Sequence, residues 1–211
     1  MSKISYRLSH FFHISKRGWS IERKKILSDF FELITELLIN EDEAKRTFPE
    51  AEKSLKSFFK KRGGPQSSLP ILFFNYHYHN YILRVATFKE KSMQLVNCFL
   101  SLGLPIEKVN ESLILGMSQV KKKTKVYKLL NEIINDDILK ENITQANEFK
   151  HRISQPKGKT YNEFIASKIY FLSSQSKTET IKQLKQKKRD LHKGIRRIKK
   201  YSDRLFYFLH S

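Results

Sequence analysis

The segment from Leu69 to Leu102 is the longest apolar-rich stretch of the chain. Its apolar residues recur at helical spacing and are numerous enough to cover a helix on more than one side. Such a helix is stable only when other helices cover it, so we expect this segment to form the long central helix of a bundle. Gly103 and Pro105 follow it, which predicts that the helix ends there with Gly103 as its C-terminal cap.

Amphipathic spacing predicts helices in much of the remaining chain. The predicted ranges are 20–40, 49–61, 105–119, 121–134, 136–152, 161–173 and 177–209, and the Gly- and Pro-containing stretch 62–68 predicts a loop. Strand-like alternation does not persist anywhere in the sequence, so the predicted fold class is all-α. We expect a helical bundle over residues 1–176 and a basic amphipathic C-terminal helix over 177–211, packed on the same domain.

Several residues of the central segment decide which kinds of site the chain can hold. Arg84 lies among apolar residues and needs an acceptor, so we expect it to pair with a carboxylate of a neighbouring helix. Cys98 is the single cysteine, so neither a disulfide framework nor a thiolate metal cluster is available. His77 and His79 are two residues apart and point to different faces of a helix, which does not suit a metal pair. We therefore expect no metal and no cofactor.

The last predicted helix combines an apolar seam with many cations. The seam comprises Ile181, Leu184, Leu191, Ile195, Ile198 and Leu205, with Lys188 and Ser202 at two of its positions. Residues 177–200 hold eleven Lys and Arg against two Asp and Glu, a net +9 out of +20 for the chain. This balance favours a polyanionic partner, nucleic acid before an acidic membrane. The residues expected to contact RNA here are Lys187, Lys188, Arg189, Arg196 and Arg197.

The sequence also bears on the compartment. We find no apolar run long enough to span a membrane and no N-terminal signal with an apolar core and a cleavage site. With one cysteine, a reducing environment suits the chain. We expect a cytoplasmic protein without a membrane partner.

The polar helix predicted over 136–152 ends in a histidine that could take part in catalysis. Asn147 and His151 are four residues apart and therefore share one helix face. Cleavage of RNA by its own 2′-hydroxyl needs proton transfer and positive charge but no metal. A histidine in a last helical turn is suited to proton transfer, with Asn147 to orient it and Lys150 and Arg152 as nearby cations that we expect to contact RNA.

The hexapeptide Ala-Asn-Glu-Phe-Lys-His from Ala146 to His151 resembles the signature of HEPN domains, which are all-α. In that signature an arginine, usually followed by a polar residue, precedes a histidine by four to six intervening residues. Asn147 fits the polar position and His151 the histidine, whereas Ala146 stands where the arginine belongs. In many HEPN members the motif implies a metal-independent endoribonuclease whose two copies meet across a homodimer. Such members are toxins or antiphage effectors, so RNA, a second copy and an antitoxin or defence-system protein are the implied partners.

Ala146 cannot clamp a phosphate, and loss of one transition-state donor costs on the order of 100–1000-fold in rate. The catalytic set implied by the resemblance, Ala146, Asn147 and His151, is therefore expected to be impaired. An inactivated variant of a toxic nuclease, a natural pseudo-enzyme and a coincidental match all stay open as explanations. A non-catalytic RNA-binding or partner-neutralising protein is the alternative function. A structural protein that self-associates through the seam of the last helix is a third interpretation.

Overall fold

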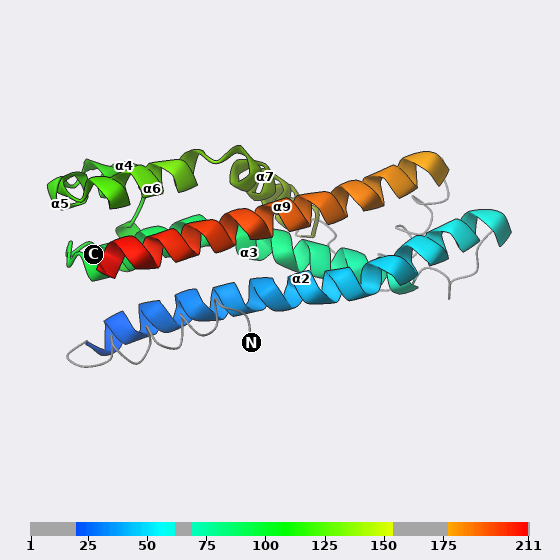
Figure 1. The fold of residues 1–211 in the computed structure, drawn as a ribbon, viewed down its shortest axis with the longest axis horizontal. Coiled ribbons are helices and arrows are strands. Elements are labelled where there is room, and N and C mark those ends of the chain that lie inside the picture. Colours follow the sequence, from blue (N-terminus) through cyan, green and yellow to red (C-terminus); the bar gives the residue numbers. More distant parts are fainter. Residues whose placement is uncertain (1–19, 62–68, 154–176, 211) are drawn as a thin grey trace. The chain divides into compact units, whose positions relative to one another are not determined.

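The computed structural model describes residues 20–61, 69–153 and 177–210, and within these ranges every regular element is a helix (Figure 1). The elements are α2 (Ile21–Lys61), α3 (Leu69–Phe99), the 3-10 helix η2 (Ile106–Lys108), α4 (Glu111–Gly116), α5 (Ser118–Lys122), α6 (Thr124–Asn135), α7 (Asp137–Ile153) and α9 (Lys177–His210). The all-α class is confirmed, and α3 is the long helix predicted at 69–102. Among the described helices, none combines the length and the apolar character needed to cross a membrane. The helix predicted at 161–173 lies outside the described residues.

The described residues form two compact units. Unit 1 contains the described residues up to Leu37, together with Arg84–Glu141 and the chain from Gly194 onward. Unit 2 contains Leu38–Leu83 and the described part of Asn142–Lys193. The helices α2, α3, α7 and α9 each contribute residues to both units.

The core of unit 1 is built around Phe30 of α2, whose side chain is fully buried. Its ring centroid lies 5.8 Å from that of Phe88 on α3 and 5.6 Å from that of Phe206 on α9, so residues of three helices meet here. In the same unit, Arg84 Nε donates to Glu36 Oε2 at 2.5 Å. This contact confirms that Arg84 pairs with a carboxylate of a neighbouring helix.

Aromatic residues fill the core of unit 2. Phe74 on α3 is fully buried and meets Phe48 of α2 edge-on, with 5.6 Å between ring centroids. Tyr78 stacks beside Phe74 at 6.4 Å, and its hydroxyl donates to Oε1 of Gln145 at 3.0 Å. The hydrogen bond attaches α7 to α3 within this unit.

The apolar seam of α9 is buried by the chain itself, except for the half-buried Ile181. In unit 2, Leu184 and Leu191 are 4% and 2% exposed. In unit 1, Ile195, Ile198 and Leu205 are at most 2% exposed. Because other helices of the same chain cover these residues, the seam is not a surface for self-association. Its burial also leaves the cationic positions of α9 on the outside.

α2 is one continuous helix, whereas the sequence predicts separate helices at 20–40 and 49–61. Pro49 lies inside it, although proline lacks the N–H that a helix interior uses. The helix continues because Ala44 and Phe48 keep helical spacing on the buried side, at 2% and 6% exposure. An ion pair between Lys45 Nζ and Glu41 Oε1, 2.7 Å apart, supports the polar stretch between the two predicted helices.

The end of α3 also differs from the prediction. The N–H of Leu102 donates to the carbonyl of Asn97 at 3.1 Å, and Ser101, with φ 52°, adopts the left-handed conformation. Ser101 therefore occupies the capping position predicted for Gly103, which has φ 74° two residues later. Beyond it, the single element predicted at 105–119 is divided into η2, α4 and α5. The break before α4 comes from Asn110, whose side chain accepts a backbone N–H and caps that helix.

Candidate nucleic-acid interface

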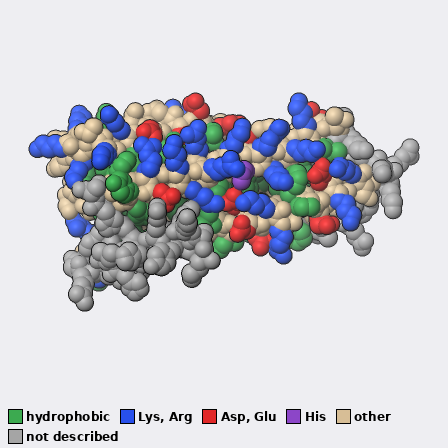
Figure 2. All heavy atoms as spheres, in the orientation of Figure 1, with side chains coloured by type: hydrophobic (Ala, Val, Ile, Leu, Met, Phe, Trp, Pro, Cys, Tyr) green, Lys and Arg blue, Asp and Glu red, His purple; other side chains and the backbone are tan. Residues whose placement is uncertain are grey.

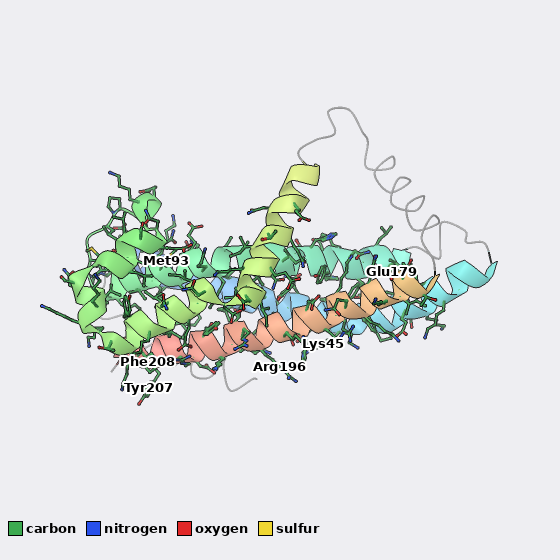
Figure 3. All side chains as sticks on the ribbon, turned by 90° about the horizontal axis from the view of Figure 1, so that it is seen from above. Lys45, Met93, Glu179, Arg196, Tyr207 and Phe208 are labelled. Carbon is green, nitrogen blue, oxygen red and sulfur yellow. The ribbon has the colours of Figure 1, made fainter. Side chains whose placement is uncertain are left out.

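α9 presents cations at the positions that its buried seam leaves exposed. In unit 2 these are Lys182, Lys185, Lys188, Arg189 and Lys193, and in unit 1 they are Arg196, Arg197 and Lys200. Figure 2 shows Lys and Arg side chains interleaved with apolar ones on the face in view, where acidic side chains are fewer. The Arg196 side chain points away from the helices (Figure 3). This distribution agrees with the electrostatic footprint of a nucleic-acid-binding surface.

Lys187 differs from the other predicted RNA contacts of α9. Its Nζ donates to Asn75 Oδ1 at 2.7 Å and lies 5.4 Å from the ring centroid of Tyr78, so it is engaged with α3 inside unit 2. Lys187 is half-buried, whereas Lys188 is exposed. Lys187 therefore packs against α3, although the seam spacing singles out Lys188 rather than Lys187.

Arg197, another residue predicted to contact RNA, lies near the carboxylate of Asp136 in unit 1. The Asp136 side chain accepts two backbone N–H groups at the start of α7 and the hydroxyl of Tyr201, at 2.6 Å. Burial and this hydrogen bond raise the pKa of Tyr201. Arg197 Nε lies 3.7 Å from Asp136 Oδ2, so its charge is partly balanced. Arg196 has no carboxylate within ion-pair distance in the described part of the chain.

A pocket of about 620 Å³ opens in unit 2 between α2, α3 and α9. Its lining residues are Ala44, Lys45, Phe48, Phe74, Lys185, Lys188, Arg189, Leu191 and His192. Four of these are Lys or Arg and four are apolar, so the pocket combines a cationic rim with an apolar wall. Lys188 Nζ lies 4.1 Å from the ring centroid of Phe48, a cation–π contact that holds the ammonium at the pocket.

Two carboxylates balance part of the charge around this pocket. Glu41, whose side chain is 3% exposed, lies 2.7 Å from Lys45 Nζ and 3.4 Å from His192 Nδ1. Glu52 lies 3.0 Å from Lys56 Nζ and 3.5 Å from Lys185 Nζ. The hydrogen bond from Lys56 lowers the pKa of Glu52, against an opposing effect of burial. Glu52 therefore stays ionised at neutral pH.

α7 carries the motif positions, and two of them face in different directions. Leu139, Asn142 and Ala146 are buried at helical spacing, with Ala146 at 0% exposure, whereas Asn147 is exposed. Position 146 thus belongs to the packed face of α7 in unit 2. His151 lies within α7, as predicted, but the side chains of residues 149–153, which include Lys150, His151 and Arg152, lie outside the described ones.

The pocket brings together residues that the sequence alone did not single out, among them Lys45, Lys185 and His192. The sequence contains a partial signal for this pocket, because Lys185, Arg189 and His192 recur at intervals of four and three and therefore share one helix face. Nothing in the sequence pairs this face with Lys45 of α2, since that pairing depends on how the helices pack. Among the described side chains, no group of three His, Cys, Asp or Glu could hold a metal ion.

Comparison with known proteins relates this arrangement to one family. The family model described as Cthe2314-like HEPN matches residues 48–210, a range that contains the motif positions and all of α9. No curated protein and no solved structure matches the chain. Because the matched range covers most of the 211 residues, the chain belongs to the HEPN family, as the hexapeptide at 146–151 implied.

Proposed function

We propose that this HEPN protein binds RNA through the exposed cations of α9. Membership of the family implies RNA as the substrate class and often a dimer. The observation that carries the proposal is the division of α9 into a buried apolar seam and exposed Lys and Arg. Among the described residues, no carboxylate pairs with Lys188, Arg189 or Arg196. Cations of this kind can replace the counterions of phosphates, which is the main source of affinity for nucleic acids.

The first prediction is a loss of RNA affinity when the charge of these three residues is reversed. The variant Lys188→Glu/Arg189→Glu/Arg196→Glu, the α9 reversal variant, is expected to bind RNA at least about 100-fold more weakly, because attraction to phosphate becomes repulsion. Fluorescence anisotropy with a labelled single-stranded RNA measures the change at a fixed salt concentration.

The matched control reverses three cations elsewhere. Lys121, Lys122 and Lys123 are all exposed, and their replacement by Glu changes the net charge by the same amount. We expect this variant to retain most of the RNA affinity. Equal losses in the two variants would mean that net charge alone attracts RNA, and would contradict a specific role for α9.

A second candidate function is a metal-independent endoribonuclease at the C-terminal part of α7. Its supporting observation is that α7 runs from Asp137 to Ile153, so Asn147 and His151 share one face of a continuous helix, on which Asn147 is exposed. In the proposed reaction the 2′-oxygen attacks the adjacent phosphorus, a cyclic phosphate forms and the 5′-oxygen leaves. His151 transfers the protons, and Lys150 and Arg152 supply the charge that Ala146 cannot.

This second proposal includes the cellular role that the family suggests. A homodimer would bring two motifs to one cleft, and the protein would act as a toxin or antiphage effector controlled by an antitoxin or defence partner. With Ala146 in place of arginine, the activity is expected to be slow. Expression of the protein in cells tests this role. We expect the wild type to arrest growth and His151→Ala to relieve the arrest.

Incubation of the protein with RNA in EDTA tests the chemistry. We expect slow cleavage that leaves cyclic phosphate ends and falls about 100-fold in His151→Ala, the lower range for loss of a general acid or base. Cleavage at an unchanged rate in His151→Ala would contradict this mechanism. RNA binding without cleavage would leave the first proposal intact and remove the second.

A further inference from the structure

The pocket of unit 2 contains two kinds of cation. Lys45 and Lys185 have carboxylate partners, Glu41 at 2.7 Å and Glu52 at 3.5 Å. Lys188 instead lies over the ring of Phe48, and Arg189 donates to the amide oxygen of Gln186 at 2.8 Å. In the described part of the chain, neither of these two has an acidic partner. The rim therefore offers two positive charges to an anionic group from outside.

The wall of the same pocket is apolar. Ala44, Phe48, Phe74 and Leu191 contribute to it and are at most 6% exposed. A phosphate ion alone would leave this wall in contact with water, and a purely apolar ligand would leave the two cations unused. A ligand that satisfies both surfaces joins a flat, largely apolar group to an anion. The volume of about 620 Å³ falls in the usual range for pockets that enclose such a ligand.

The cations around the pocket favour a chain of phosphates over a single one. Lys185 and Lys193 lie one turn before and one turn after Arg189 on the same face of α9, and both are exposed. Lys45 of α2 also lines the pocket. Lys193 has no carboxylate partner among the described residues, so a phosphate next to a bound nucleotide would meet it, whereas a free nucleotide would not.

From these observations we infer that the pocket between Ala44, Phe48, Lys188 and Arg189 binds one unpaired nucleotide of an RNA strand. The base lies against the apolar wall, and its phosphate lies on Lys188 and Arg189. The base has to be unpaired because a paired base in an A-form duplex is stacked inside the helix and cannot enter a pocket. The inference rests on the proposed RNA binding and adds a preference for single strands.

The test compares ligands and variants. The ligands are a single-stranded oligoadenylate, a blunt RNA duplex of the same length, and AMP. Ala44→Leu fills the pocket without a change of charge, and Ala86→Leu, on α3 in unit 1, is its matched control. We expect Ala44→Leu to weaken binding of the single strand about 10-fold, the effect of one lost base contact, and to leave duplex binding unchanged. Ala86→Leu should bind both as the wild type does.

A rim variant covers the case in which Ala44→Leu does not fold. Arg189 is exposed, so Arg189→Gln should leave the fold intact and weaken single-strand binding several-fold. Unchanged single-strand affinity in Ala44→Leu, or in Arg189→Gln, would overturn the pocket while RNA binding by the wild type stands. If AMP bound as tightly as the oligoadenylate, the pocket would be a site for a free nucleotide and not for a nucleotide within an RNA strand. Absence of RNA binding by the wild type would overturn the proposed function and this inference together.

Discussion

Replacing Phe30 by alanine is expected to lower the free energy of unfolding by about 3–5 kcal/mol, the usual cost of removing a buried phenyl ring. Phe30 is fully buried and its ring meets those of Phe88 and Phe206 at 5.8 and 5.6 Å between centroids. The substitution leaves a cavity where residues of α2, α3 and α9 meet in unit 1. For a chain of this size the melting temperature should fall by roughly 6–20 °C.

Phe73 provides the matched control for this prediction. It lies on α3 with 58% of its surface exposed, so Phe73→Ala removes the same ring without opening a cavity. Thermal unfolding followed by circular dichroism should place Phe73→Ala within a few degrees of the wild type. A Phe30→Ala variant that melts with the control would contradict the packing of α2 against α3 and α9 in unit 1.

Introducing an arginine at position 146 is expected to destabilise the protein by about 3 kcal/mol or more. Ala146 has no solvent exposure and shares the packed face of α7 with Leu139 and Asn142. A guanidinium there would overpack the core of unit 2, at about 1–3 kcal/mol, and leave a buried charge without a carboxylate partner, at about 3–5 kcal/mol. Thermal unfolding of Ala146→Arg measures the change.

Asn147→Arg adds the same side chain one residue later, at an exposed position. We expect it to change stability by less than about 0.5 kcal/mol. If Ala146→Arg unfolded at the same temperature as Asn147→Arg, position 146 would not face a packed core. That result would instead support a site in which an arginine at 146 reaches a cleft and clamps phosphate.

Much of this fold can be predicted from periodicity. The α3 helix, the polar α7 helix and the buried seam of α9 follow from apolar residues at helical spacing, which packing turns into buried faces. The partner type of Arg84 also follows, because an arginine among apolar residues needs a carboxylate. These features depend on local sequence and on one general requirement of burial.

The features that the sequence does not predict correctly depend on tertiary contacts. Pro49 and the polar residues before it suggest a break in α2, but Ala44 and Phe48 are held in the core of unit 2 and keep the helix continuous. The seam spacing singles out Lys188 rather than Lys187, and only the position of Asn75 on α3 decides that Lys187 is engaged inside unit 2. The pocket needs the pairing of α2 with α9, which separate helical patterns do not specify.

In the proposed function, α9 binds RNA by direct contacts between its cations and phosphates. Its most direct test is the salt dependence of RNA binding, because each phosphate contact in a single strand contributes about 0.7 to the slope of log Kd against log salt concentration. The wild type and the Lys121/Lys122/Lys123 control should share one slope, and the α9 reversal variant, which loses three contacts, should have a slope lower by about 2. An α9 reversal variant with the slope of the wild type would contradict direct contacts between the cations of α9 and RNA phosphates.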